Sequence, residues 1–186
     1  MGGKLTEIAI TQQEGLTGFQ TVITSDHAYI HDGIAFTGIV NTGSISAAYD
    51  IAFTTPSIAD GKFMHWRPIG ISSDADSVGW VMFEGDAFSA GTAVVPINRN
   101  RNSTNLSKVT TLVKGATATP TGTMISAGQV GTSGTAANRA GGGAAANEEI
   151  VLKPATNYVL TLTPAGATTV ILELFWYEED EGLDDD

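Results

Sequence analysis

The fold is decided by a stretch near the C-terminus, Asn157-Tyr158-Val159-Leu160-Thr161-Leu162-Thr163, which runs through the turn Pro164-Ala165-Gly166-Ala167 into residues 168–177. Apolar and polar side chains alternate along its first arm, which is typical of a half-buried strand. The second arm is apolar in both alternating sets, with Val170, Leu172, Leu174 and Trp176 on one side and Ile171, Phe175 and Tyr177 on the other. This pattern predicts a central strand with protein above and below it. The short Pro/Gly turn predicts that the two arms pair as a hairpin, onto which earlier strands pack.

Short strand-like segments, separated by turn signals such as Asp32-Gly33 and Asp60-Gly61, precede this hairpin. They are residues 5–10, 19–24, 28–31 (forming a hairpin with 34–40), 47–54, 63–67, 78–84, 92–98, 108–114 and 123–125. Helical periodicity is nearly absent. The sequence therefore predicts an all-β fold, an antiparallel β-sandwich of the jelly-roll type with long surface loops. Trp66, Trp80 and Trp176 are expected in its core.

The length of 186 residues predicts one domain with a single core. Residues 1–16 are expected to form an N-terminal arm or a first strand, residues 17–178 the β-sandwich domain, and residues 179–186 a disordered acidic tail. Within the sandwich domain, residues 126–147 are dominated by Gly, Ala, Ser and Thr. Such a segment cannot pack a core, so we expect a long surface loop there.

The composition disfavours several classes of partner. The formal net charge is −11, and seven of the acids lie between Glu178 and Asp186, where we expect a solvated end. The rest of the chain is mildly acidic, which disfavours a nucleic-acid partner because phosphate backbones require a basic face. No apolar run approaches the ~20 residues that a membrane helix needs, so no membrane partner is expected. There is no cysteine, which excludes disulfides and thiolate catalysis.

The segment from Asp26 to Asp32 contains His27 and His31 and has the composition of a metal site. In a strand, however, these two histidines lie about 13 Å apart at ~3.3 Å per residue, too far to share one zinc ion. Only a bend, with His65 joining them, would make a site, as a metal-dependent enzyme of the cupin type requires. Three histidines, no cysteine and no paired acids in an apolar setting offer little for catalysis. We therefore expect no metal, no cofactor and no enzymatic activity.

The most unusual polar stretch is the run Asn98-Arg99-Asn100-Arg101-Asn102-Ser103. A solvated polar loop explains it equally well, but amides and guanidinium groups make directional hydrogen bonds. Two arginines in an acidic chain would also attract an acidic patch on a partner. These six residues are therefore our candidate interface.

Several stretches together resemble a family of tailed-bacteriophage virion proteins, the small β-sandwich decoration or cement proteins of the head. The most specific are the run from Asn98 to Ser103 and the pair Leu152-Lys153-Pro154 and Asn157-Tyr158. Weaker ones are Asp60-Gly61-Lys62, His65, Phe83-Glu84, Gly91-Thr92, Gly122-Thr123, Glu149-Ile150-Val151 and Trp176-Tyr177-Glu178. The resemblance spans roughly residues 27–178; the acidic tail and the Gly/Ala-rich segment fit it least.

The resemblance implies that the protein binds the outer surface of the phage head and bridges copies of the major capsid protein, which stabilises the shell. It further implies self-association as a homotrimer, a location on the outside of the virion, and assembly in the cytoplasm of the host bacterium. A second hypothesis is a jelly-roll module of a tail or spike that binds host-surface glycans. That function would need exposed aromatic platforms beside polar loops, and the sequence locates none clearly.

Overall fold

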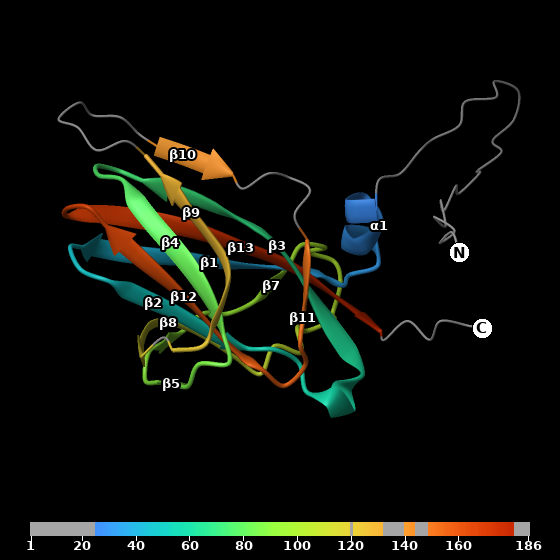
Figure 1. Cartoon of the computed structure of the whole chain (residues 1–186). Helices are drawn as coiled ribbons and strands as arrows, with labels where there is room; N and C mark the ends of the chain where they lie inside the picture. The colour runs from blue at the N-terminus through green and yellow to red at the C-terminus, as the bar shows by residue number, and fades with distance from the viewer. Residues whose placement is uncertain (1–24, 120, 132–139, 144–148, 181–186) are drawn as a thin grey trace, which may run out of the picture.

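The computed structural model describes residues 25–119, 121–131, 140–143 and 149–180, and these form two antiparallel β-sheets packed face to face (Figure 1). The predicted all-β sandwich is therefore confirmed. The predicted strands at 5–10 and 19–24 and most of the acidic tail lie outside the described residues. The two helices in the described part, α1 (Ser25–His31) and the 3-10 turn η1 (Ile58–Asp60), are too short to cross a membrane.

The first sheet is built on β13, which pairs with β3 on one side and β1 on the other. Its order is β10-β3-β13-β1-β7, and β11 also pairs with β3. The strands are β1 (Ala35–Ile45), β3 (Lys62–Ser73), β7 (Ile97–Asn98), β10 (Ala140–Gly143), β11 (Ile150–Leu152) and β13 (Thr168–Asp180). The central position predicted for residues 168–177 is thus confirmed.

The second sheet is built on β12, which pairs with β2 and β4. Its order is β5-β8-β2-β12-β4-β9, and β6 also pairs with β8. The strands are β2 (Tyr49–Thr54), β4 (Val78–Glu84), β5 (Phe88–Ser89), β6 (Thr92–Ala93), β8 (Thr111–Ala118), β9 (Thr123–Val130) and β12 (Asn157–Pro164).

The predicted hairpin between β12 and β13 is wrong, because the turn at 165–167 carries the chain from the second sheet to the first. Both strands have one largely apolar face. Leu160 and Leu162 of β12 and Leu172 of β13 are completely buried. Because the two strands lie in different sheets, their apolar faces meet across the core and bury each other. The outer side of β13 is not covered throughout, since Ile171 is 47% exposed. The prediction of protein on both faces of this strand therefore fails in its middle.

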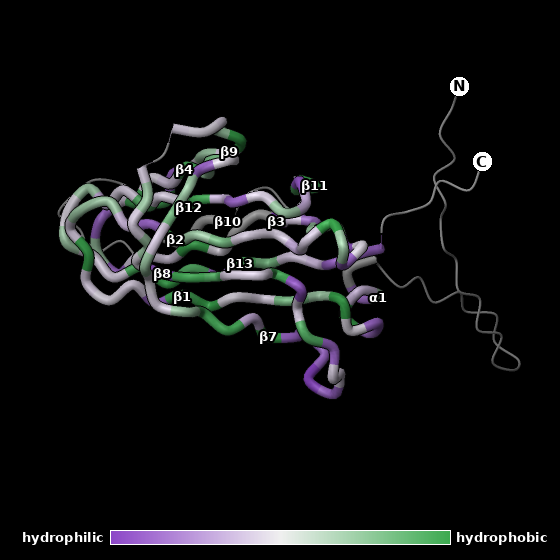
Figure 2. The backbone as a smooth tube through the Cα atoms, turned by 90° about the horizontal axis from the view of Figure 1, so that it is seen from below, coloured by the Kyte–Doolittle hydropathy of each residue, from purple (hydrophilic) through white to green (hydrophobic). Residues whose placement is uncertain are grey.

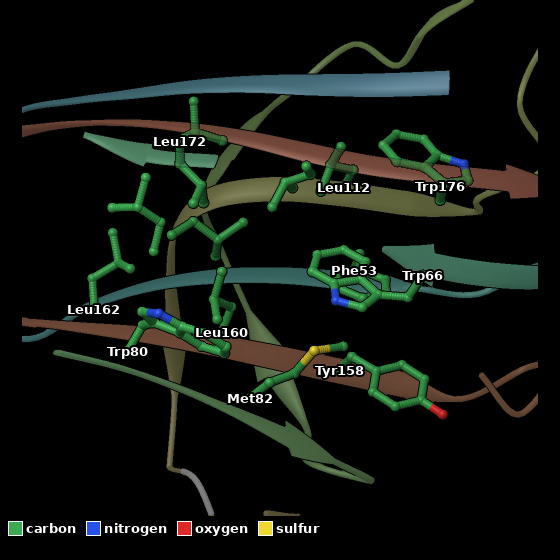
Figure 3. Close-up of a cluster of buried hydrophobic side chains, with 14 of the residues drawn as sticks. Phe53, Trp66, Trp80, Met82, Leu112, Tyr158, Leu160, Leu162, Leu172 and Trp176 are labelled. Atoms are coloured by element: carbon green, nitrogen blue, oxygen red, sulfur yellow. The ribbon is translucent and has the colours of Figure 1, made fainter. Parts of the chain in front are cut away.

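The core lies between the two sheets, as the buried side chains in Figure 3 show. The three tryptophans, Trp66, Trp80 and Trp176, are all buried there, as predicted. Phe53 of β2 stacks on Trp66 of β3, with 5.4 Å between ring centroids, and on Tyr158 of β12 at the same distance. Aromatic side chains thus join strands of both sheets near one end of the sandwich.

The segment predicted as a strand at 28–31 is the helix α1. The Asp32-Gly33 signal is not a hairpin turn but a helix C-cap: Gly33 has φ +70° and donates to Ile30 O, and Ile34 donates to Tyr29 O. These two bonds form the Schellman motif that ends many helices. Glycine suits the left-handed position in either structure, so the dipeptide alone does not separate them.

Other boundaries also differ from the predictions. The single strand expected over 92–98 is divided into β6 and β7 by a break that includes Pro96, which cannot donate to a ladder. The loop expected over 126–147 begins within β9 and contains β10. The strand expected over 63–67 extends to Ser73, with a register shift on the paired β13 between Glu173 and Phe175. Residues 179 and 180, expected in the disordered acidic tail, are the last residues of β13.

Candidate interaction surface

Three segments meet at one end of the sandwich: helix α1, the loop that follows β7, and the last residues of β13 (Figure 1). We call the surface formed by α1, residues 98–108 and residues 175–180 the loop end. In Figure 2 the loop after β7 is strongly hydrophilic and extends from the sheet below α1. Of the six candidate interface residues, Asn98 is the last residue of β7 and the other five lie in this loop.

Side-chain amides attach the loop to the C-terminal end of α1. The Nδ2 group of Asn98, a buried residue, donates to the carbonyl of Gly33 over 2.8 Å and to that of Asn105 over 3.1 Å. Asn100 Nδ2 donates to the carbonyl of His31 over 3.1 Å, and Asn105 Nδ2 to that of Gly33 over 3.3 Å. The last carbonyls of the helix thus find partners in the loop, as carbonyls at a helix end require.

The same asparagines also shape the loop internally. The backbone N–H of Asn100 donates to Asn98 Oδ1 over 2.9 Å, and that of Asn102 to Asn100 Oδ1 over 3.1 Å. Ser103 Oγ accepts from the backbone of Asn105 over 3.1 Å. These bonds from residue i+2 to the side chain of residue i are Asx and Ser turns. Asn98, Asn100 and Ser103 therefore fix the backbone conformation of the loop.

The structure gives the candidate interface residues two different roles. Asn98, Asn100 and Ser103 hold the loop together and onto the sandwich. Arg99, Arg101 and Asn102 are exposed, and the guanidinium carbon of Arg99 lies 5.0 Å from the centre of the Phe175 ring. The residues available to a partner are thus Arg99, Arg101 and Asn102.

A cluster of aromatic and charged side chains, which the sequence did not predict, covers the outer side of β13 next to α1. The Tyr177 ring stacks with Tyr29 of α1, with centroids 4.1 Å apart, and with His65 of β3 at 4.4 Å. Arg67 lies over the same ring at 5.6 Å. Tyr177 is consequently buried although it points away from the core. Burial and the neighbouring Glu149 carboxylate raise the pKa of the Tyr177 hydroxyl.

Glu149, just before β11, binds this cluster together. Its carboxylate accepts from Tyr177 Oη over 2.5 Å, lies 2.9 Å from His65 Nδ1, and accepts from Arg67 Nη2 over 3.2 Å. Burial raises the pKa of Glu149, but the hydrogen bonds of Tyr177 and His65 and the positive charges outweigh that effect, so the pKa lies below its ordinary value. Glu149 thus joins β11, β3 and β13 through hydrogen bonds to both of its carboxylate oxygens.

Glu178 is a second carboxylate that holds the loop, and it corrects the prediction that the acids from Glu178 onward form a solvated end. It faces inward on β13 and is 3% exposed. It accepts from Ser107 Oγ over 2.5 Å, from the Lys108 backbone over 2.8 Å and from Trp176 Nε1 over 2.9 Å. Three donors compensate for its burial, and they fix the second half of the loop against β13.

A cavity of about 430 Å³ opens beside Glu178, between the loop and the first sheet. Its lining combines exposed Leu106, two lysines and polar loop groups: Gly33, Ile34, Phe36, Lys62, Thr104, Asn105, Leu106, Lys108 and Glu178. Lys62 forms an ion pair with Asp180 over 2.7 Å. Leu106 is 83% exposed, the largest fraction among the exposed large apolar side chains of the described residues. The loop end therefore presents apolar, cationic and amide groups together.

The three histidines do not converge. His65 belongs to the Glu149 cluster, whereas His27 and His31 are exposed on α1. The separation of about 13 Å expected for a strand is wrong, because a helical turn brings the two Nε2 atoms to 2.7 Å. In the part of the chain that the structure describes, no group of three or more His, Cys, Asp or Glu residues is placed to hold a metal ion.

No family model matches this chain, and no curated protein matches it either. The resemblance to phage decoration proteins therefore stays a prediction from the sequence.

Proposed function

We propose that this protein decorates the head of a tailed bacteriophage, binding the outer surface of the capsid and bridging copies of the major capsid protein. The proposal starts from the resemblance of its sequence motifs to that family. In this proposal the protein acts by binding and not by catalysis, and it is located on the outer surface of the virion.

The observation that carries the proposal is that the two sides of the loop after β7 have different roles. Its inner side is hydrogen-bonded to α1 and to Glu178, and its outer side exposes Arg99, Arg101, Asn102 and Leu106. A loop that is already ordered loses little conformational entropy on binding, so more of its contact energy appears as affinity. A surface of this kind suits adhesion to a fixed lattice.

The charges of the loop also suit a protein partner with an acidic patch. Arg99 and Arg101 are separated by one residue and are both exposed on an otherwise acidic chain of net charge −11. Guanidinium groups form paired hydrogen bonds with carboxylates, and complementary charge speeds association and selects the partner. Leu106 adds an apolar contact beside them.

Stabilisation of the shell would follow from mass action. A protein that binds only the assembled, expanded capsid shifts the equilibrium toward that state. Attachment through several copies adds avidity, so each contact need not be strong. We propose a homotrimer as the unit that binds, since closed symmetry also protects sheet edges.

We further infer that the sandwich is a jelly roll, and the strand order supports this. When β5, β6, β7, β8 and β11 are left out, eight strands remain, with β1, β13, β3 and β10 adjacent in the first sheet and β2, β12, β4 and β9 adjacent in the second. The first and last strands thus lie side by side, as do the second and the next to last. Two such interleaved sets of four are what a jelly roll of eight strands requires.

Sedimentation with capsids tests the proposed function. Purified protein is mixed with expanded heads of the parent phage that lack it, and the heads are pelleted. We expect the protein to co-sediment, and the double variant R101E/L106D to bind at least tenfold more weakly. The matched control is M124D, which places an acid on β9 of the second sheet, where Met124 is 62% exposed. Wild-type protein that stays in the supernatant at saturating concentration would rule the proposal out.

The cavity beside Glu178 favours a second candidate function, the binding of host-surface glycans by a tail or spike module. Its lysines, Thr104 and Asn105 offer polar groups to sugar hydroxyls. Phe36, the aromatic residue of its lining, is covered, however, with 3% of its surface exposed. Binding to a glycan array without binding to heads would support this candidate over decoration.

A further inference from the structure

Helix α1 presents two imidazoles that point at each other on its exposed side. His27 and His31 are four residues apart, the spacing that places side chains on the same face of a helix. Their Nε2 atoms lie 2.7 Å apart and their ring centroids 4.5 Å apart. Both side chains are exposed, in contrast to His65, which is engaged with Glu149.

We propose that His27 and His31 form a two-nitrogen binding site for a late transition-metal ion, Ni²⁺ or Cu²⁺. Neutral imidazole is a preferred ligand of these ions, and a pair of histidines at positions i and i+4 of a helix is an established way to chelate one. In the metal-free protein one Nε2–H donates to the lone pair of the other nitrogen. In the complex both lone pairs are directed at the ion, with the protons on the Nδ1 atoms.

The distance between the nitrogens is compatible with neighbouring ligand positions on one ion. With metal–nitrogen bonds of about 2.1 Å, two nitrogens 2.7 Å apart subtend an angle of about 80° at the ion. This is close to the 90° between neighbouring ligands in square-planar or octahedral sites, which Ni²⁺ and Cu²⁺ adopt, and well below the tetrahedral angle that zinc prefers. Ca²⁺ and Mg²⁺ require oxygen ligands and are not expected to bind. Water would fill the other positions, since both rings face solvent.

Metal binding at this position would act on the whole loop end. Helix α1 has only seven residues, and helices this short are marginal without added contacts. A chelate across one turn fixes that turn, and an ion that binds only the folded helix stabilises it by mass action. The carbonyl of His31 accepts from Asn100, so a firmer helix would also hold the asparagine loop more firmly.

Calorimetric titration with Ni²⁺ at pH 7.5 tests the site in the full, untagged chain, since a polyhistidine tag would bind the probe itself. We expect about one Ni²⁺ per chain, and at least tenfold weaker binding in each of the variants H27Q and H31Q. The matched control is H65Q, which also removes one imidazole but leaves the pair intact and should bind as wild type does. Ni²⁺ should raise the melting temperature of wild type and of H65Q, and leave that of H27Q and H31Q unchanged.

Two results would overturn the proposal. One is wild-type protein that binds Ni²⁺ no better than H27Q/H31Q does; the other is H65Q losing affinity as much as the helix variants do. A second readout is pH, because protons compete with metal for imidazole nitrogens. Affinity should fall at least tenfold between pH 7.5 and pH 5, and the lack of any fall would exclude imidazole ligands. This inference does not depend on the proposed function.

Discussion

Gly33 connects the end of helix α1 to the loop after β7. Its φ of +70° ends α1, its carbonyl accepts from Asn98 and Asn105, and a Cβ added to it would collide with Ser103 Oγ. A side chain here therefore meets two penalties, a left-handed backbone and a displaced loop. Helix end and loop cannot both keep their present positions with any residue other than glycine.

We expect Gly33→Ala to destabilise the fold by about 2 to 4 kcal/mol, the sum of a left-handed alanine and an overpacked contact. The matched control is Gly43→Ala. Gly43 has a similar φ of +66°, but a Cβ there meets nothing within 4 Å, so about 1 kcal/mol is expected. Urea denaturation of the two variants measures the difference. Equal losses would show that Ser103 does not press on Gly33.

Because the pKa of Glu149 is lowered in the folded protein, its contribution to the free energy of unfolding should depend on pH. The folded protein holds this proton less tightly than the unfolded chain, so the carboxylate stabilises the fold above its ordinary pKa of ~4.3 and loses that effect as pH falls through the lower folded value. Glu149→Gln should therefore cost on the order of 1 kcal/mol at pH 5 and less at pH 3. Denaturation at both pH values measures the cost. The control for net charge is Glu173→Gln, which removes an exposed carboxylate from β13, the strand that Glu149 contacts through Tyr177.

Single residues differed in how far the sequence could predict them. The tryptophans were predictable because large aromatic rings in strand-like segments are usually buried. Glu149 was not, since its role depends on β11, β3 and β13 lying side by side, which the register of the ladders decides. Glu178 looked like the start of an acidic tail, and only the alternation of β13 places it on the inner face beside Trp176.

At the level of the element, β13 shows how one strand serves two environments. Leu172 is completely buried between the sheets, whereas its neighbour Ile171 is 47% exposed on the outer face. We expect Leu172→Ala to destabilise the protein by about 2 to 5 kcal/mol, because it leaves a cavity in the core. Ile171→Ala removes a side chain of the same size and should cost less than about 1 kcal/mol. Thermal or urea unfolding measures both, and similar losses would mean that the outer face of β13 is also covered.

The elements that the sequence misjudged share a physical cause. A Pro/Gly turn between two apolar strands fits a hairpin and also a passage between sheets, and only the partners available to β12 and β13 decide between them. In the same way, Asp32-Gly33 fits a hairpin turn or a helix cap. The seven residues of α1 carry no periodic apolar stripe, and the helix is held by the stack of Tyr29 on Tyr177 and by the bond of Asn100 to His31. Tertiary contacts therefore override local preference in both places.

At the scale of the whole molecule, the predictable part was the architecture of two sheets. Alternating strands with frequent turns and a single apolar core leave few other packings. The loop end was only half predictable. The composition of residues 98–103 indicated a contact loop, but their hydrogen bonds show that half of these side chains are committed within the chain. The part that remains as candidate interface is smaller, and Leu106, which composition did not single out, is exposed beside it.

Self-association is the property that the proposed function predicts for the whole molecule. We expect light scattering on the purified protein to give three times the 19.3 kDa of one chain, independent of concentration in the micromolar range, because a closed trimer has no open contact left for growth. The variant R101E/L106D should keep this mass while losing affinity for heads, since the proposed function places these exposed loop residues against the capsid and not between copies. If the variant became monomeric, the loop end would be the surface between copies, and attachment to the capsid would have to use another face. A mass of 19.3 kDa for wild type at all concentrations would contradict the trimer.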